Sequence, residues 1–135
     1  MILTLPWPPS INTYYRSPSK GPLAGRVLIS EDGRAYRKAV AAIVRGIKHR
    51  SFDVPLAMAI EASPPDRRAR DLDNLLKSVL DSLQHAGVYL NDAQIDDLHI
   101  RRCSVKRGGS IAVRIIPLVE SDTCWRQALG DDVPA

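Results

Sequence analysis

Residues 64–77 read Pro64-Pro65-Asp66-Arg67-Arg68-Ala69-Arg70-Asp71-Leu72-Asp73-Asn74-Leu75-Leu76-Lys77, which places three acids and four bases within fourteen residues. Apolar residues then recur at the spacing of an amphipathic helix, at Leu72, Leu75, Leu76, Val79, Leu80 and Leu83. Gly87 suits the position just after such a helix. We therefore predict a helix that ends near Gly87 and begins near Asp71, with Asp71 at or near the N-cap.

The start of this predicted helix gathers charged groups that suit phosphodiester chemistry. Asp73 lies in the first turn and Lys77 one turn later, and Asp92 would join them if the return after the helix folds back toward its start. Three convergent carboxylates form a hard oxygen site that selects Mg²⁺ or Mn²⁺ over zinc. Such an ion polarises a phosphate oxygen and lowers the pKa of a bound water, while Lys77 would bind the scissile phosphate or assist proton transfer. The pattern indicates a metal-assisted phosphodiester site.

Each of these acids also has a purely structural explanation. An aspartate before an apolar helical run is most often a cap, and Asp73 with Lys77 is an ordinary i,i+4 pair worth roughly a few tenths of a kcal/mol. Stability does not explain the arginines of this corner, because surface ion pairs contribute little. A phosphate-binding corner explains them. Asp81, one turn beyond Lys77, is predicted to be a surface or helix-pairing acid rather than a ligand.

The N-terminal part predicts a strand, a long loop and a helix. Met1 to Leu5 reads as a strand that ends at Pro6-Trp7-Pro8-Pro9. Ser30 is a good N-cap for a helix that runs to about Lys48. The apolar stripe expected on this helix contains Tyr36, Val40, Ile43 and Ile47.

Residues 10–29 form a loop longer than a compact domain usually contains without a function. Tyr14, Tyr15 and Arg16 lie in it, and tyrosines interleaved with bases suit base stacking plus phosphate contact. The alternative is that the tyrosines pack on the core and the bases are solvated. The two interpretations weigh about equally.

Two further segments predict the sheet. Residues 54–62 read as a strand, because Leu56, Met58 and Ile60 alternate with smaller or polar residues. Residues 98–105 and 110–116 predict a β-hairpin around Lys106-Arg107-Gly108-Gly109.

Length and composition limit the possible functions. The 135 residues suffice for one domain, and their net charge of +4 is unevenly spread. Residues 118–135 contain four acids and one base, so the first 117 residues carry 18 bases and 11 acids, a net charge of +7. A basic body favours a polyanionic partner such as nucleic acid. We expect residues 118–135 to be an acidic, partly disordered tail.

No run of 18 apolar residues occurs, and the N-terminus lacks the features of a signal peptide, so we expect a soluble cytoplasmic protein without membrane association. Cys103 and Cys124 show no CxxC spacing, which indicates neither a disulfide framework nor a zinc site.

Four pieces of the sequence together resemble the RusA family of Holliday junction resolvases, phage-derived endodeoxyribonucleases. The pieces run in order from about residue 3 to residue 116. They are Leu5-Pro6-Trp7-Pro8-Pro9-Ser10 with Asn12, Tyr14, Tyr15 and Arg16; Pro65-Asp66-Arg67-Arg68 with Arg70-Asp71-Leu72-Asp73-Asn74-Leu75 and Lys77; Asn91-Asp92-Ala93-Gln94; and Lys106 with Gly108-Gly109. Residues 1–117 then form a RusA-like endonuclease domain, and the tail lies outside the family pattern.

The resemblance implies a homodimeric α+β protein, a single domain with a mixed β-sheet and two main helices, that nicks two opposed strands of four-way junction DNA symmetrically in recombination and repair. It implies Mg²⁺ or Mn²⁺ and no small-molecule cofactor. The catalytic and metal-binding aspartates of the family fall on Asp71, Asp73 and Asp92, and its catalytic lysine on Lys77. The DNA-binding residues would be Tyr14, Tyr15, Arg16, Arg67, Arg68, Arg70 and Lys106.

Two other functions fit the same residues. A non-catalytic protein that binds junctions or single-stranded DNA would keep the basic surface and use the acids only as helix caps. A metal-dependent nuclease that acts on flaps or RNA would use the same acid cluster, because the acids alone do not specify which nucleic acid is the substrate.

Overall fold

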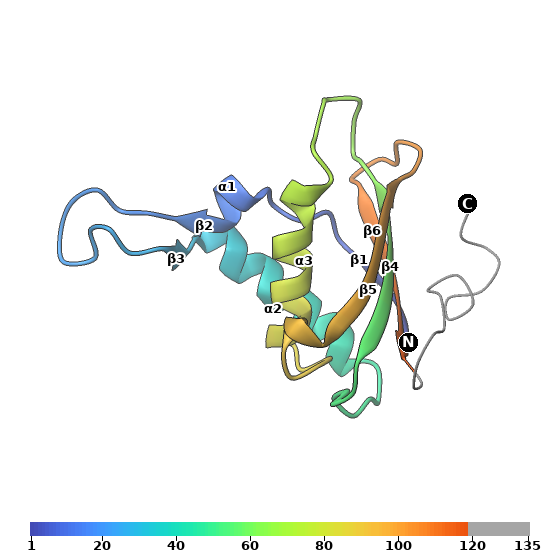
Figure 1. The fold of residues 1–135 in the computed structure, drawn as a ribbon. Coiled ribbons are helices and arrows are strands. Elements are labelled where there is room, and N and C mark those ends of the chain that lie inside the picture. Colours follow the sequence, from blue (N-terminus) through green and yellow to red (C-terminus); the bar gives the residue numbers. More distant parts are fainter. Residues whose placement is uncertain (119–135) are drawn as a thin grey trace.

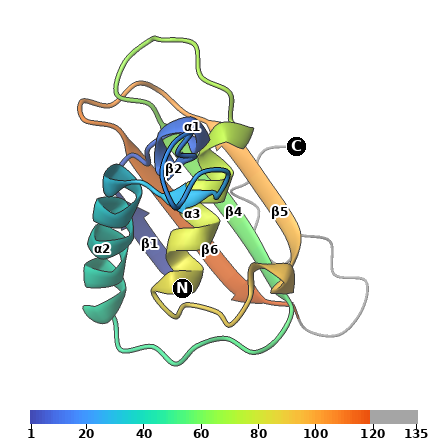
Figure 2. The ribbon, with the colours of Figure 1, turned by 90° about the vertical axis from the view of Figure 1, so that its left-hand side faces the viewer.

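The structure is a computed structural model that describes residues 1–118. Its centre is a four-stranded sheet in the order β1-β6-β4-β5, with helices packed on one face (Figures 1 and 2). The strands of this sheet are β1 (Ile2–Leu5), β4 (Leu56–Ser63), β5 (Ile95–Arg102) and β6 (Ser110–Pro117). The predicted α+β class with a mixed sheet is confirmed. The predicted disorder of the acidic tail falls on residues outside the described range.

Two long helices and several short elements complete the fold. The helices are α2 (Glu31–Arg45), α3 (Asp73–His85), the short α1 (Ile11–Tyr14) and the 3-10 helix η1 (Asp92–Gln94). Strands β2 (Tyr15–Arg16) and β3 (Leu28–Ile29) pair as a small antiparallel ribbon. The expected long loop therefore contains a helical turn and a ribbon whose connection projects away from the body (Figure 1).

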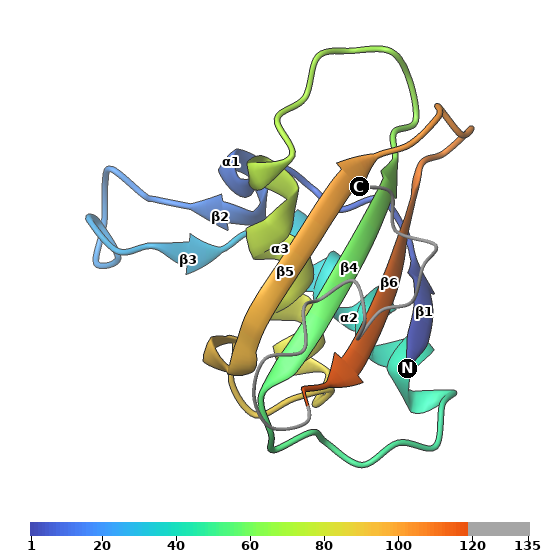
Figure 3. The ribbon, with the colours of Figure 1, turned by 45° about the vertical axis from the view of Figure 1, so that its right-hand side comes forward.

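Strand β4 lies between β6 and β5 in the sheet, so the predicted β-hairpin of these two strands is wrong. It pairs with β6 antiparallel, from Leu56 opposite Pro117 to Ser63 opposite Ser110, and with β5 parallel. β5 and β6 are therefore separated by β4 instead of paired with each other, as Figure 3 shows. The physical reason is that β4 is buried almost throughout, so both its edges need hydrogen-bonding partners inside the sheet.

Helix α2 begins where the sequence predicted. The hydroxyl of Ser30 accepts a hydrogen bond from the backbone N–H of Gly33 at 3.0 Å, so Ser30 is the N-cap. The buried stripe is Tyr36, Val40 and Val44, and the helix ends at Arg45 instead of Lys48. A Cβ at Gly33 would overlap the carbonyl oxygen of Tyr14, so only glycine lets α1 pack this closely against α2.

Helix α3 connects β4 to the parallel strand β5 across the covered face of the sheet (Figure 1). Leu75, Val79 and Leu83 form its buried stripe, and Gly87 follows with a φ of +82°, as the sequence predicted. The N-cap is Leu72, however, and no side chain caps the helix. Asp71 therefore lies next to the N-cap, as predicted, but the interpretation of its side chain as a cap is wrong.

The core lies between the helices and the inner face of the sheet. Its largest fully buried side chains include Tyr14, Tyr89, Leu3, Leu5, Leu56, Met58, Ile60, Leu83, Ile111 and Ile115. Cys103 is a free thiol. Among the helices of residues 1–118, none has the length and apolar character needed to span a membrane.

Candidate active site

The candidate site lies along α3 and around the segment that precedes it. β4 ends at Ser63, and residues 64–72 then lead to the first turn of α3 (Figure 1). The backbone N–H of Lys106 donates to the carbonyl of Pro64 at 2.9 Å, so the turn between β5 and β6 lies beside this segment. The arginine-rich segment and Lys106 therefore face solvent at the same end of the sheet, as expected for parts of one surface.

Lys77 and Asp92 form the centre of the candidate site. The Lys77 Nζ lies 3.8 Å from Asp92 Oδ2, with the two side chains 48% and 33% exposed. Asp92 is held by η1, in which Asn91 and Gln94 form a capping box, and its backbone N–H donates to Gln84 Oε1 at 2.9 Å. The return after α3 thus brings Asp92 against the helix, and the ion pair that Lys77 makes is with Asp92 instead of Asp73.

Asp71 and Asp73 lie at the start of α3 with exposed side chains. Within residues 1–118 neither carboxylate makes a hydrogen bond or an ion pair. Asp73 is the first residue of the helix, as predicted. Asp92 is anchored at Gln84, eleven positions along the helix from Asp73, which corresponds to about 16 Å of helical rise.

The donor chemistry of this region fits a hard divalent cation, because exposed carboxylates without partners are ligands of the type that Mg²⁺ prefers. The part of the chain described here contains no group of three or more Asp, Glu, His or Cys side chains already arranged to hold a metal ion. The structure therefore brings Asp92 to Lys77 and leaves the three-aspartate metal site as a prediction.

The arginines before α3 divide into one fixed residue and two exposed ones. Arg70 donates to the two oxygens of Asp66 at 2.6 and 3.0 Å. The hydrogen bonds from Arg70 and from the backbone of Arg68 lower the pKa of Asp66 to about 2. Arg67 is exposed, and the side chain of Arg68 is 83% exposed.

These arginines line a shallow pocket of about 370 Å³ together with Arg102 at the end of β5. Arg102 donates to the backbone carbonyl of Arg70, which joins the sheet edge to the segment before α3. Arg102 could not be assigned to this surface from the sequence, because only the parallel pairing of β5 with β4 brings it here. The pocket offers several guanidinium groups to a phosphate.

The predicted contact between Tyr14 and DNA is wrong, because Tyr14 is buried in the core. Its side chain is 0% exposed, and its hydroxyl donates to Asp81 and accepts from Arg37 Nε at 2.8 Å. Burial, and secondly the bond to Asp81, raise the pKa of Tyr14 to about 12. Of the two interpretations of this tyrosine, core packing is the one the structure supports.

Asp81 is the helix-pairing acid that the sequence predicted. Arg37 on α2 donates to Asp81 Oδ2 on α3 from Nε at 2.9 Å and from Nη2 at 2.5 Å. With Tyr14 on α1, this group connects three helices. We call Tyr14, Arg37 and Asp81 the helix-joining cluster.

Tyr15 and Arg16 follow this cluster and remain at the surface. Tyr15 is partly exposed, and its ring meets the ring of Tyr14 edge-on at 4.8 Å. Burial raises the pKa of Tyr15, and the charges of Asp81, Lys77, Arg37 and Asp92 also act on it. Tyr15 is therefore only partly covered and stays available for the predicted contact with DNA.

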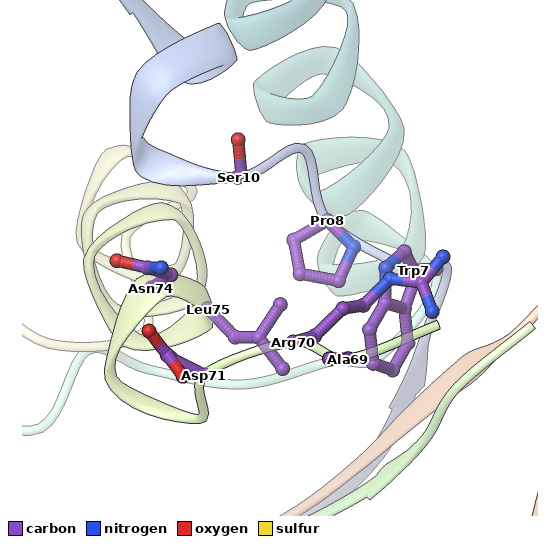
Figure 4. A pocket seen from close by; sticks show the side chains of 8 residues that line it. All are labelled: Trp7, Pro8, Ser10, Ala69, Arg70, Asp71, Asn74 and Leu75. Carbon is purple, nitrogen blue, oxygen red and sulfur yellow. The ribbon is translucent and has the colours of Figure 1, made fainter. Parts of the chain in front are cut away.

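A second pocket, of about 460 Å³, opens beside Asp71 (Figure 4). Its lining residues come from the segment after β1, from the segment before α3 and from the first turn of α3. They are Trp7, Pro8, Ser10, Ala69, Arg70, Asp71, Asn74 and Leu75. No role was predicted from the sequence for Trp7, Ser10 or Asn74. The available signal was that all three lie in the motifs shared with the RusA family.

Comparison with known proteins identifies the family of this chain. The family model described as Endodeoxyribonuclease RusA matches residues 6–116. The chain is 44% identical over 114 residues to "Crossover junction endodeoxyribonuclease rusA" of Enterobacteria phage 82, covering 84% of this chain and 91% of the relative. It is 45% identical over 117 residues to proteins named "Crossover junction endodeoxyribonuclease RusA" from Escherichia coli K12 and Shigella sonnei, with the same coverage. The chain therefore belongs to the RusA endodeoxyribonuclease family.

Proposed function

We propose that this protein is a structure-selective endodeoxyribonuclease that resolves four-way DNA junctions by nicking two opposed strands, with Mg²⁺ or Mn²⁺ as cofactor. The observation that carries the proposal is the Lys77–Asp92 pair on the helix whose start presents Asp71 and Asp73. The curated relatives of this family are named for crossover junctions, which supports the substrate class.

The exposed arginines supply affinity for the DNA backbone. Arg67, Arg68 and Arg102 line one pocket, and Lys106 lies in the neighbouring turn. Contacts of this kind release counterions from DNA, so binding should weaken steeply as salt is raised. Arg70 contributes less net charge to such contacts, because Asp66 is already bound to its guanidinium group.

The chain's own residues position the phosphodiester. Asp92 holds the Lys77 ammonium at the side of α3, where it would neutralise charge on a non-bridging phosphate oxygen. Asp71, Asp73 and Asp92 would supply the carboxylate ligands of the metal ion. When bound, that ion would polarise the phosphate and lower the pKa of the attacking water.

A homodimer would suit this substrate. A junction with two-fold symmetry that is cut twice is matched by a two-fold protein with one site in each subunit. We therefore propose that the active form is a dimer. Analytical ultracentrifugation across the concentration range of the cleavage assay checks this, and a monomer that cuts both strands at one encounter would contradict it.

The decisive experiment uses a synthetic four-way junction labelled in turn on each strand, with Mg²⁺, Mn²⁺ or EDTA. We expect paired nicks in opposed strands with either metal ion and none in EDTA, and no cutting of linear duplexes with the same arm sequences. Lys77→Met should lower the cleavage rate by at least about 100-fold. The matched control is Lys48→Met, at an exposed lysine after α2.

Two outcomes would favour the alternative functions. Salt-sensitive junction binding without cleavage in either metal ion would support a non-catalytic junction-binding or single-strand-binding protein. Faster cutting of flaps or RNA than of junctions in direct competition would support a nuclease with a different substrate.

A further inference from the structure

The pocket beside Asp71 is formed by two motif segments far apart in sequence. Residues 7–10 follow β1 and form one wall, while Asn74 and Leu75 in the first turns of α3 form the other (Figure 4). Ser78 of α3 donates to the carbonyl of Pro9 at 2.8 Å, which fixes the two walls relative to each other. Their separation is therefore set by the fold and does not depend on a ligand.

One wall of the pocket contains the aromatic side chain of Trp7, which its neighbours hold in place. A Cβ at Gly109 would lie 2.8 Å from the Cβ of Trp7, and the same position is in contact with Pro65, so Trp7 is enclosed on that side. The guanidinium carbon of Arg70 lies over the Trp7 ring, 5.7 Å from its centre, so the side chains of Arg70 and Trp7 form this wall together. Because Asp66 holds Arg70 with two hydrogen bonds, this wall is preorganised for stacking.

Besides the Asp71 carboxylate, which the proposed function assigns to the metal ion, the Asn74 amide is a polar group of the pocket that is available to a ligand. Within residues 1–118 its side chain has no hydrogen-bond partner. An amide offers two donors and one acceptor carbonyl, which match the donor and acceptor edge of a nucleobase. Ser10 is less available, because its hydroxyl already shares a hydrogen bond with Thr13 at 3.1 Å.

The position of the pocket restricts its occupant. Asp71 is part of the lining, and Ala69 and Arg70 are shared with the arginine-lined pocket. A ligand here would thus lie between a proposed catalytic carboxylate and a phosphate-binding surface. The volume of about 460 Å³ is in the range of small-molecule sites. A nucleotide of the bound DNA fits both neighbours, since its phosphate suits the arginines and its base the aromatic wall.

We propose that this pocket holds one unstacked nucleobase next to the phosphodiester that is cut, stacked on Trp7 and read along its edge by Asn74. This inference rests on the proposed function, because it assigns the pocket to the same DNA substrate. It makes Trp7 and Asn74 residues that determine which base lies beside the cleaved bond. Enzymes that act on DNA commonly recognise a base removed from the stack in this way.

The first test measures base preference. Nicks are mapped with the unmodified protein, and each flanking nucleotide is then replaced in turn by the other three bases with its pairing partner adjusted. We expect cleavage rates at one flanking position to differ by about tenfold between the best and the worst base. In Asn74→Ala the cleavage rates with the four bases should become nearly equal. Asn74→Asp should change which base is preferred, because the carboxylate replaces the donors of the amide by acceptors.

The matched control is His85→Ala, an exposed residue at the far end of the same helix, which should keep the original spread of rates. A spread of rates that is the same in Asn74→Ala and in the unmodified protein would overturn the proposal. So would equal rates with all four bases at both flanking positions.

The second test needs neither metal nor cleavage. Trp7 and Trp125 are the two tryptophans of the chain, so in Trp125→Phe the fluorescence comes from Trp7 alone. In EDTA, binding of an intact junction should quench this emission. A junction with abasic sites in place of the nucleotides at the crossover should still bind, but it should quench the emission much less. Equal quenching by the two junctions would overturn the proposal.

The two tests separate this inference from the proposed function. Base-dependent quenching in a protein that cuts no junction would support the pocket and contradict the nuclease activity. Junction cutting with base-independent quenching and unchanged base preference in Asn74→Ala would support the nuclease and contradict the pocket.

Discussion

Two aspartates of α3, Asp73 and Asp81, lie eight positions apart and have opposite surroundings. Asp81 is 21% exposed and accepts hydrogen bonds from Tyr14 and Arg37 on two other helices. Asp73 is exposed, and within residues 1–118 it has no partner. The first carboxylate is used to assemble the fold, while the second remains free to bind a ligand.

The comparison shows how one helix separates stability from chemistry. Partly buried and fully hydrogen-bonded charges contribute to stability and cannot leave their partners without a cost. Exposed charges contribute little to stability, so they can be placed for function. We therefore expect variants at the two ends of α3 to show opposite effects, and the following experiments test that expectation.

The largest effect is expected for Asp73→Asn. Loss of one carboxylate at the proposed metal site should lower the rate of junction cleavage by at least about 100-fold while junction binding stays intact. Single-turnover cleavage and gel-shift titration measure the two quantities. Asp97→Asn is the control, because Asp97 pairs with Ala57 on the face of the sheet away from the main core. Cleavage by Asp73→Asn at the normal rate would refute the site assignment.

Asp81→Ala should have the opposite effect. Removing this carboxylate leaves Arg37 and the Tyr14 hydroxyl without their main partner, so the free energy of unfolding should fall by about 2–3 kcal/mol. Urea denaturation followed by circular dichroism measures it. Junction cleavage, assayed at a temperature at which the variant is folded, should be largely retained. Unchanged stability would show that the helix-joining cluster does not hold the helices together.

A smaller effect is expected when both exposed arginines are replaced. Arg67→Ala with Arg68→Ala should weaken junction binding by about tenfold and make the salt dependence shallower by about two counterions, with little change in stability. Binding titrations at several salt concentrations give both values. The matched control is Arg45→Ala with Arg50→Ala, at two exposed positions at and just after the C-terminal end of α2. An unchanged salt slope would exclude Arg67 and Arg68 as phosphate contacts.

The smallest effect concerns pH. The pKa of Tyr14 is raised from 10.0 to about 12 in the folded protein, so the stabilisation from its protonated hydroxyl is complete below pH 10 and is lost as the pH rises toward 12. Tyr14→Phe should lower stability by about 1 kcal/mol at neutral pH and make the fall between pH 10 and 12 less steep. Urea midpoints measured across this pH range check both. An equally steep fall in the variant would assign the alkaline sensitivity to other groups.

Local elements could be predicted because their causes are local. The N-cap of α2 at Ser30 and the buried stripe of α3 follow from side chains within a few positions of one another. The alternation of Leu56, Met58 and Ile60 likewise identified β4. The end of α2 was placed three residues too late because Val44, and not Ile47, meets the core.

Pairing between distant segments could not be predicted in the same way. Two neighbouring strands joined by a Gly-rich turn favour a hairpin, yet β4 separates β5 from β6. Tyr14 likewise has the same neighbours in sequence whether it stacks on DNA or enters the core. The deciding partners, Arg37 and Asp81, lie 23 and 67 positions away.

The amino-acid sequence by itself determined that α2, α3 and β4 form, the basic character of the body and the residues that carry the family resemblance. Only the tertiary structure decided that Lys77 pairs with Asp92, that Tyr14 is buried, and that Trp7 and Asn74 share a pocket beside Asp71. The physical reason is range. Helix periodicity and capping depend on residues a few positions apart, whereas an ion pair, a buried hydroxyl or a pocket wall depends on segments that only the packed sheet and helices bring together.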